Sequence, residues 1–85
     1  MARGAGLTLV TRRDCDLCAE MHAALARLAR SRALPALEVV DVDSDPQLAR
    51  RHGLDVPVLL LDGTVVCRHR LDAAELERLL RHGLA

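Results

Sequence analysis

The stretch LTLVTRRDCDLCAEM, residues 7–21, decides how this chain folds. Its apolar first part, residues 7–11, is typical of a short β-strand, and the loop after it leads to two cysteines with C-x-x-C spacing, Cys15 and Cys18. From Cys15 to about Arg32, apolar residues recur on one helical face, which is formed by Leu17, Met21, Leu25 and Leu28. The sequence therefore predicts a strand-to-helix junction with both cysteines at the start of the helix.

The next segments continue the alternation of strand and helix. LEVVDVD, residues 37–43, is rich in valine and predicts a second strand. PQLARRH, residues 46–52, predicts a short helix that begins with a proline after the cap residue Asp45 and stops at Gly53. This part of the chain thus forms a second strand-and-helix pair.

The last third of the chain predicts two more strands and a helix. VPVLLL, residues 56–61, is apolar throughout, as in a strand buried on both faces, and the turn dipeptide Asp62-Gly63 joins it to a fourth strand. The final helix, residues 72–81, opens with the capping-box pattern DAAE, in which Asp72 is the cap.

These elements define an α/β fold in the order β-α-β-α-β-β-α. A strand-helix-strand start requires a right-handed crossover, so the first two strands are parallel, whereas the hairpin makes the last two antiparallel. We therefore expect a four-stranded mixed sheet flanked by helices on both faces, with residues 56–61 in a central strand. The 85 residues suffice for one domain, residues 1–85, with its core within residues 7–82.

Composition narrows the range of partners. Basic and acidic residues balance at 12 each, every basic residue is arginine, and no aromatic residue is present. Neither a basic field nor a stacking platform is available, so we expect no nucleic-acid partner and no membrane partner. No apolar run approaches membrane-spanning length, and the first residues lack the apolar segment of a secretory signal, so we expect a cytoplasmic protein.

The spacing of the cysteines predicts different environments for the two thiols. With Cys15 at the helix N-cap, free backbone N–H groups and the charge of Arg12 and Arg13 favour a thiolate and so a lowered pKa for Cys15, which Asp14 and Asp16 oppose. Cys18 lies further into the helix and is expected to stay a thiol until Cys15 has formed a mixed disulfide, which Cys18 then resolves.

Two alternatives use the same cysteines differently. A metal or iron–sulfur carrier would hold its metal with Cys15, Cys18 and His22, completed by Cys67 or His69. In a redox-silent adaptor, the fold persists without the chemistry. We expect Cys67 to serve as a small half-buried hydrophobe, and His52 and His82 to be helix C-terminal residues.

Three segments in order, TRRDCDLC, VPVLLLDG and LDAAEL, resemble the glutaredoxin-like branch of the thioredoxin fold, particularly its small bacterial members. The resemblance covers residues 7 to about 81. It implies that Cys15 is the nucleophile, that Cys18 is the resolving thiol, and that Pro57 is a cis proline beside them.

The resemblance also implies a binding surface for glutathione or an extended peptide. Val56 would offer its backbone N–H and C=O, Arg12 would meet a glutathione carboxylate, and Asp72 would hold the glutathione amino group, while Leu17 lies on the same surface. The chain departs from the family between the cysteines, where Asp16 and Leu17 replace the usual proline and aromatic residue, and before the last helix, where RHRL, residues 68–71, replaces Gly-Gly.

The sequence thus predicts a glutaredoxin-like thiol-disulfide oxidoreductase that acts on disulfide-containing proteins or glutathione mixed disulfides. It predicts a monomer with no bound organic cofactor and no metal. Glutathione or another low-molecular-weight thiol is the expected reductant.

Overall fold

A computed structural model describes residues 6–82, so the ends of the expected 1–85 domain lie outside the described part. Its elements follow the predicted order, and their bounds are β1 Gly6–Thr11, α1 Asp16–Ser31, β2 Ala36–Asp41, the 3-10 helix η1 Val42–Ser44, α2 Pro46–His52, β3 Val58–Leu61, β4 Thr64–Arg68 and α3 Ala73–His82. The four strands form one sheet in the order β2-β1-β3-β4. Within residues 6–82, no helix has the length and apolarity to cross a membrane.

The sheet is mixed, as the sequence predicts. β1 is parallel to β2, with Leu7 opposite Leu37, and antiparallel to β3, with Leu9 opposite Leu59. β3 and β4 form the antiparallel hairpin, whose turn residues Asp62 and Gly63 both have positive φ, at 50° and 85°. Two consecutive positive φ angles are the conformation that favours an Asp-Gly pair, so the prediction of this hairpin is confirmed.

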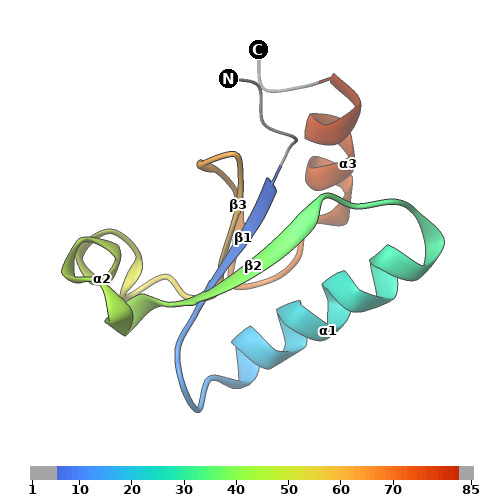
Figure 1. Cartoon of the computed structure of the whole chain (residues 1–85). Coiled ribbons are helices and arrows are strands. Elements are labelled where there is room, and N and C mark those ends of the chain that lie inside the picture. The colour runs from blue at the N-terminus through green and yellow to red at the C-terminus, as the bar shows by residue number, and fades with distance from the viewer. Residues whose placement is uncertain (1–5, 83–85) are drawn as a thin grey trace.

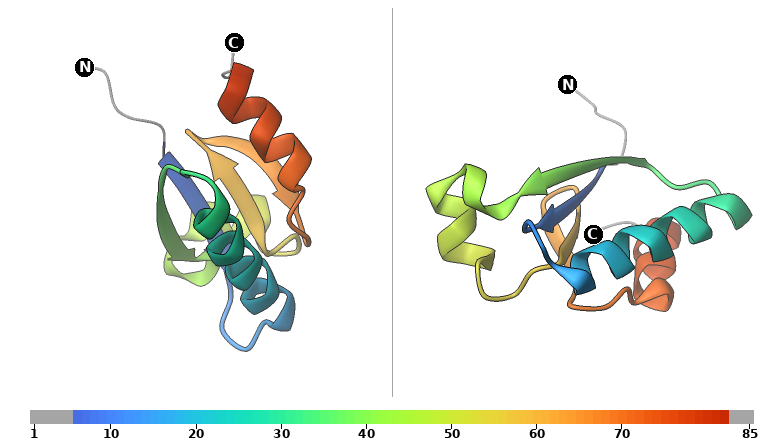
Figure 2. Two further views of the ribbon diagram at one scale, coloured as in Figure 1. Left: turned by 90° about the vertical axis from the view of Figure 1, so that its right-hand side faces the viewer. Right: turned by 90° about the horizontal axis from the view of Figure 1, so that it is seen from below.

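Helices cover both faces of the sheet (Figure 1, Figure 2). α1 and α3 lie on one face, over a core of buried residues that includes Leu9, Met21, Leu59 and Leu76. η1 and α2 lie toward the other face, where a smaller core is formed by Val10, Val42 and Val58. The alternating faces of β1 and β3 therefore supply both cores, and these two strands are central as well as buried.

Two predicted strand boundaries are wrong. The third strand begins at Val58 rather than at residue 56, because Pro57 has no N–H for strand pairing. The second strand ends at Asp41 rather than at residue 43, because the Asp41 carboxylate accepts the N–H of Asp43 at 2.8 Å and turns the chain into η1.

Leu17, predicted to share one helical face with Met21, Leu25 and Leu28 and also to lie on the substrate surface, is 41% exposed, and Cys18 is buried with Met21 and Leu25 instead. The buried stripe of α1 consists of Cys18, Met21 and Leu25, which have helical spacing. Leu17 lies one position outside this stripe.

α3 begins at a side-chain cap. The Asp72 carboxylate accepts the N–H of Glu75 at 3.0 Å, as predicted. Glu75 does not complete the capping box, because its carboxylate accepts two hydrogen bonds from the Arg78 guanidinium, at 2.8 and 2.9 Å. These bonds lower the pKa of Glu75 and raise that of Arg78.

Substituting Asp72→Ala is expected to lower the free energy of unfolding by about 1 kcal/mol, because a helix N–H loses its acceptor. Urea denaturation followed by circular dichroism measures this change. Asp72→Asn is the matched control, since it keeps an acceptor oxygen and should retain most of the stability. Equal loss in both variants would contradict the cap as the source of the effect.

Candidate active site

The two cysteines form a disulfide at the N-terminus of α1, with their Cα atoms 5.2 Å apart. Cys15 is the N-cap residue, in extended conformation, and its carbonyl accepts the N–H of Ala19 at 3.1 Å. Its sulfur also accepts the N–H of Cys18, with 3.1 Å between N and Sγ. The predicted position of Cys15 at the cap and of Cys18 in the first turn is therefore confirmed.

The cysteines differ in accessibility. Cys15 is partly exposed, whereas Cys18 is only 4% exposed and belongs to the buried stripe of α1. A partner molecule therefore has access to the Cys15 sulfur in preference to that of Cys18. Because α1 is 16 residues long, its free N–H groups and helix dipole act on the exposed member of the pair.

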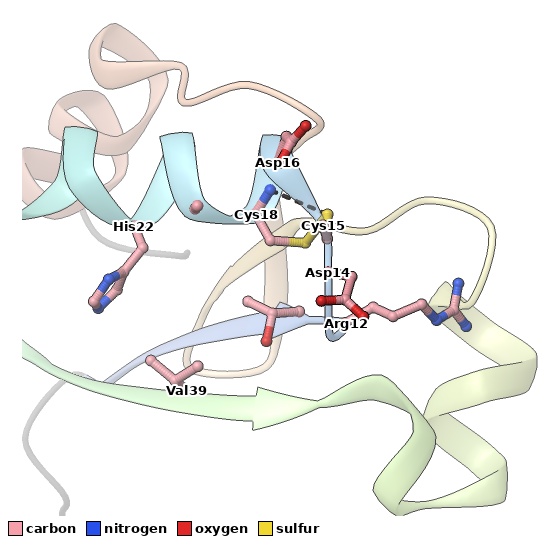
Figure 3. A pocket seen from close by; sticks show the side chains of 9 residues that line it. Arg12, Asp14, Cys15, Asp16, Cys18, His22 and Val39 are labelled. Atoms are coloured by element: carbon pink, nitrogen blue, oxygen red, sulfur yellow. Dashed lines mark hydrogen bonds between the residues drawn. A yellow bond between two sulfur atoms is a disulfide. The ribbon is translucent and has the colours of Figure 1, made fainter.

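An open groove of about 410 Å³ lies against the disulfide, between the start of α1 and the edge strand β2 (Figure 3). It is lined by Thr11, Arg12, Asp14, Cys15, Asp16, Cys18, Ala19, His22 and Val39. Of the predicted site residues, the groove brings together Arg12, Cys15 and Cys18. Leu17, Val56, Pro57 and Asp72 are not among its lining residues.

Sequence reasoning did not assign six lining residues to the substrate surface: Thr11, Asp14, Asp16, Ala19, His22 and Val39. Val39 is 51% exposed, although it lies in a strand of apolar residues, because β2 is at the edge of the sheet. His22 follows Cys18 by one helical turn, so its spacing could have indicated that it shares a face with the disulfide. Asp14 has φ 56°, a left-handed conformation that aspartate tolerates better than most residues.

Arg12 lies on the groove, but its guanidinium is held by the opposite side of the fold. Nε and Nη2 donate to the Asp43 carboxylate at 3.1 and 3.3 Å, and Nη1 donates to the Gly53 carbonyl at 2.8 Å. The hydrogen bonds to Asp43 raise the pKa of Arg12 and lower that of Asp43. In this structure Arg12 therefore links β1 to η1 and the end of α2.

The Val56-Pro57 peptide bond is cis, as the resemblance implies. Pro57 is buried immediately before β3, and its carbonyl accepts the N–H of His69 at 2.8 Å. Among residues 6–82, the backbone N–H and C=O of Val56 have no hydrogen-bond partner. They are free for the backbone pairing predicted for an extended ligand.

Side chains occupy the segment that replaces the family's Gly-Gly. His69, Arg70 and Leu71 line a second groove of about 450 Å³, together with the α1 residues Glu20, Met21, Ala23, Ala24 and Arg27. His69 has φ 69°, so the left-handed conformation is present here without glycine. The departure in sequence thus changes the side chains that line this surface.

Cys67 is a free, half-buried cysteine, consistent with the predicted packing role. Its sulfur accepts the N–H of Asp72, with 3.4 Å between N and Sγ, and burial raises the pKa of its thiol. Within residues 6–82, no three His, Cys, Asp or Glu side chains are grouped to hold a metal ion. The alternative metal set of Cys15, Cys18 and His22 with Cys67 or His69 is therefore not assembled in this conformation.

Two further histidines lie at helix C-termini. His52 and His82 are the last residues of α2 and α3, as predicted. His52 is in addition buried, and its Nδ1 has no hydrogen-bond partner among the described residues.

Three solved structures place the fold among known proteins. Protein Ne2328 from Nitrosomonas europaea is 29% identical, with a TM-score of 0.78, and the match covers 92% of this chain and 93% of that one. Protein XcR50 from X. campestris is 32% identical, with a TM-score of 0.61, over 92% and 99% of the two chains. Thioredoxin 1 from Thermosipho africanus TCF52B, at 19% identity and a TM-score of 0.58 over 89% and 94%, shares the fold.

Comparison with curated proteins gives no match. The family model described as glutaredoxin-like domain (DUF836) matches residues 6–81, which is nearly the whole described chain and includes the disulfide, the cis proline and the α3 cap. The thioredoxin-like fold and its C-x-x-C pair fit a redox role. The chain belongs to the glutaredoxin-like domain family (DUF836).

Proposed function

We propose that this protein is a dithiol oxidoreductase that reduces disulfides in proteins or mixed disulfides with small thiols. The Cys15 thiolate attacks one sulfur of the substrate disulfide, forms a mixed disulfide and releases the other sulfur as a thiol. Cys18 then attacks the Cys15 sulfur and releases the second substrate thiol. The substrate gains two electrons and two protons, and the protein becomes the Cys15–Cys18 disulfide seen in the structure.

The observation that carries this proposal is the asymmetry of the pair at the helix N-terminus. The sulfur of the partly exposed Cys15 accepts the Cys18 N–H at 3.1 Å, and in the reduced protein this donor is available to stabilise a thiolate. Cys18 is buried directly behind it, at a distance from which a disulfide forms without moving the helix. One cysteine is thus accessible for attack and the other is positioned for resolution.

The cycle also needs a reductant and a compartment. We propose that a low-molecular-weight thiol, glutathione or another, returns the disulfide to the dithiol, as two thiol molecules are oxidised to one disulfide. A reducing cytoplasm supplies such thiols. The protein acts as a monomer in this proposal, with Val56 and Pro57 facing the substrate backbone.

Trapping the intermediate tests the two-step order. With Cys67→Ser as the common background, the reduced protein treated with bis(2-hydroxyethyl) disulfide is expected to lose two hydrogens and carry no adduct. The additional substitution Cys18→Ser should leave one stable mixed disulfide on Cys15, because the resolving thiol is gone. Intact-mass spectrometry with peptide mapping distinguishes these products.

The Cys67→Ser substitution removes the one thiol other than Cys15 and Cys18 and preserves the contact of residue 67 with the Asp72 N–H. A serine at position 67 keeps an acceptor for the Asp72 N–H, so the start of α3 is not left unpaired. A persistent adduct in the protein that retains Cys18 would show that resolution does not occur. If the folded protein forms neither adduct nor disulfide, while the same protein in urea does, the redox proposal is wrong.

A further inference from the structure

The charges that line the groove beside the disulfide are unbalanced. Besides the two cysteines, four ionisable residues line it, namely Arg12, Asp14, Asp16 and His22. Arg12, the one arginine among them, is already neutralised, because Asp43 binds its guanidinium through two nitrogens and the Gly53 carbonyl binds the third. An incoming carboxylate therefore meets an arginine that already uses three of its five N–H groups and whose charge is paired with Asp43.

The acidic side chains are not compensated in this way. Asp14 and Asp16 flank Cys15 in the chain, and both line the groove (Figure 3). Within residues 6–82, neither forms an ion pair. Arg13 is exposed but is not among the lining residues, so it does not neutralise the groove directly.

We infer that this groove selects disulfides that carry positive charge next to the attacked sulfur, such as a cysteine in a basic polypeptide segment, over the anionic disulfide of glutathione. This inference rests on the proposed function and specifies its substrate class. As Cys15 attacks, its new bond to the substrate sulfur brings the neighbouring substrate groups against Asp14 and Asp16. Positive groups are then attracted, and carboxylates are repelled.

The apolar part of the groove lining suits the same class of substrate. Ala19 and the exposed Val39 give the groove apolar surface beside its carboxylates. Lysine and arginine side chains combine an apolar stem with a charged end and therefore match both features. Glutathione lacks such a side chain and carries net negative charge.

Rates with two small disulfides test the selectivity. In the Cys67→Ser, Cys18→Ser protein, only the Cys15 thiol remains, and adduct formation with cystamine or with oxidised glutathione is timed by intact mass at pH 8 and low salt. The same two disulfides are also reacted with N-acetylcysteine amide, which serves as a free-thiol reference. The ratio of the cystamine rate to the oxidised-glutathione rate is expected to be about tenfold higher for the protein than for this reference thiol. The thiolate fraction cancels in this ratio, since both rates share one thiol.

Charge-neutral variants test whether Asp14 and Asp16 cause the selectivity. Asp14→Asn with Asp16→Asn should bring the ratio close to that of the free thiol, and asparagine tolerates the left-handed conformation at position 14. Glu38→Gln is the matched control, because Glu38 is an exposed acid on β2 that does not line the groove, and it should leave the ratio unchanged. Added salt should reduce the selectivity.

The possible outcomes separate the two proposals. A ratio equal to that of N-acetylcysteine amide, with both adducts formed, would overturn the selectivity and leave the oxidoreductase proposal intact. A high ratio that persists in the Asp14→Asn, Asp16→Asn variant would also overturn it, since another feature would then be its source. Failure of both disulfides to react with folded protein contradicts the proposed function and with it the inference.

Discussion

Substituting Cys15→Ser is expected to slow the reaction with bis(2-hydroxyethyl) disulfide by on the order of 100-fold or more relative to Cys18→Ser. Both variants, on the Cys67→Ser background, keep one thiol of the pair. In Cys15→Ser that thiol is Cys18, which is 4% exposed and reacts only when the helix end opens. The measurement is the rate of adduct formation by intact mass, with circular dichroism to show that both variants are folded.

This comparison isolates the effect of the thiol's position in the site, because the reagent and the number of thiols are the same in both variants. The Cys15 sulfur accepts a hydrogen bond from the Cys18 N–H, and the Cys18 sulfur has no such bond from its own N–H. Equal rates in the two variants would contradict the assignment of Cys15 as nucleophile and Cys18 as resolving thiol. A faster Cys15→Ser variant would reverse the assignment.

The second large effect concerns the core under the active-site helix. Leu9 is 0% exposed in the central strand β1 and belongs to the cluster that also contains Met21, Leu59 and Leu76. Leu9→Ala is expected to lower the free energy of unfolding by about 3 kcal/mol, through lost burial and the cavity that remains. Urea denaturation is followed by circular dichroism, because the chain has no aromatic residue to report by fluorescence.

A surface leucine provides the matched control. Leu54 is 98% exposed between α2 and β3, so Leu54→Ala should change the free energy of unfolding by no more than about 0.5 kcal/mol. If Leu9→Ala were as mild as Leu54→Ala, the sheet face below α1 would not be the main core.

The sequence was sufficient for the order of the elements along the chain and for the pairing of β1 with β2 and of β3 with β4, because these features depend on local patterns, whereas the antiparallel pairing of β1 with β3 was not predicted. The Asp62-Gly63 turn sets the hairpin, and the apolar run 56–61 places its strand in the centre of the sheet. The position of Cys15 at the helix cap was predicted for the same reason, since it needs only the distance from the end of the strand. Boundaries failed at Asp41, where a side-chain hydrogen bond competes with strand pairing.

The surroundings of the cysteines could be predicted only in part. Arg12 was expected to be free for a carboxylate, but its partners Asp43 and Gly53 are 31 and 41 residues away in the chain. Val39 enters the groove because the fold places β2 at the edge of the sheet beside α1. Such contacts depend on tertiary geometry, which hydrophobic periodicity does not encode.

The strand order has a consequence for synthesis of the protein. β1 is made first but lies between β2 and β3, and its antiparallel partner Leu61 follows Leu7 only after most of the chain has been translated. Pairings so distant in sequence form late, because the chain between them must first be closed into a loop. Cys15 and Cys18 therefore emerge from the ribosome well before the sheet that supports their helix is complete. During that interval, both thiols are open to oxidation.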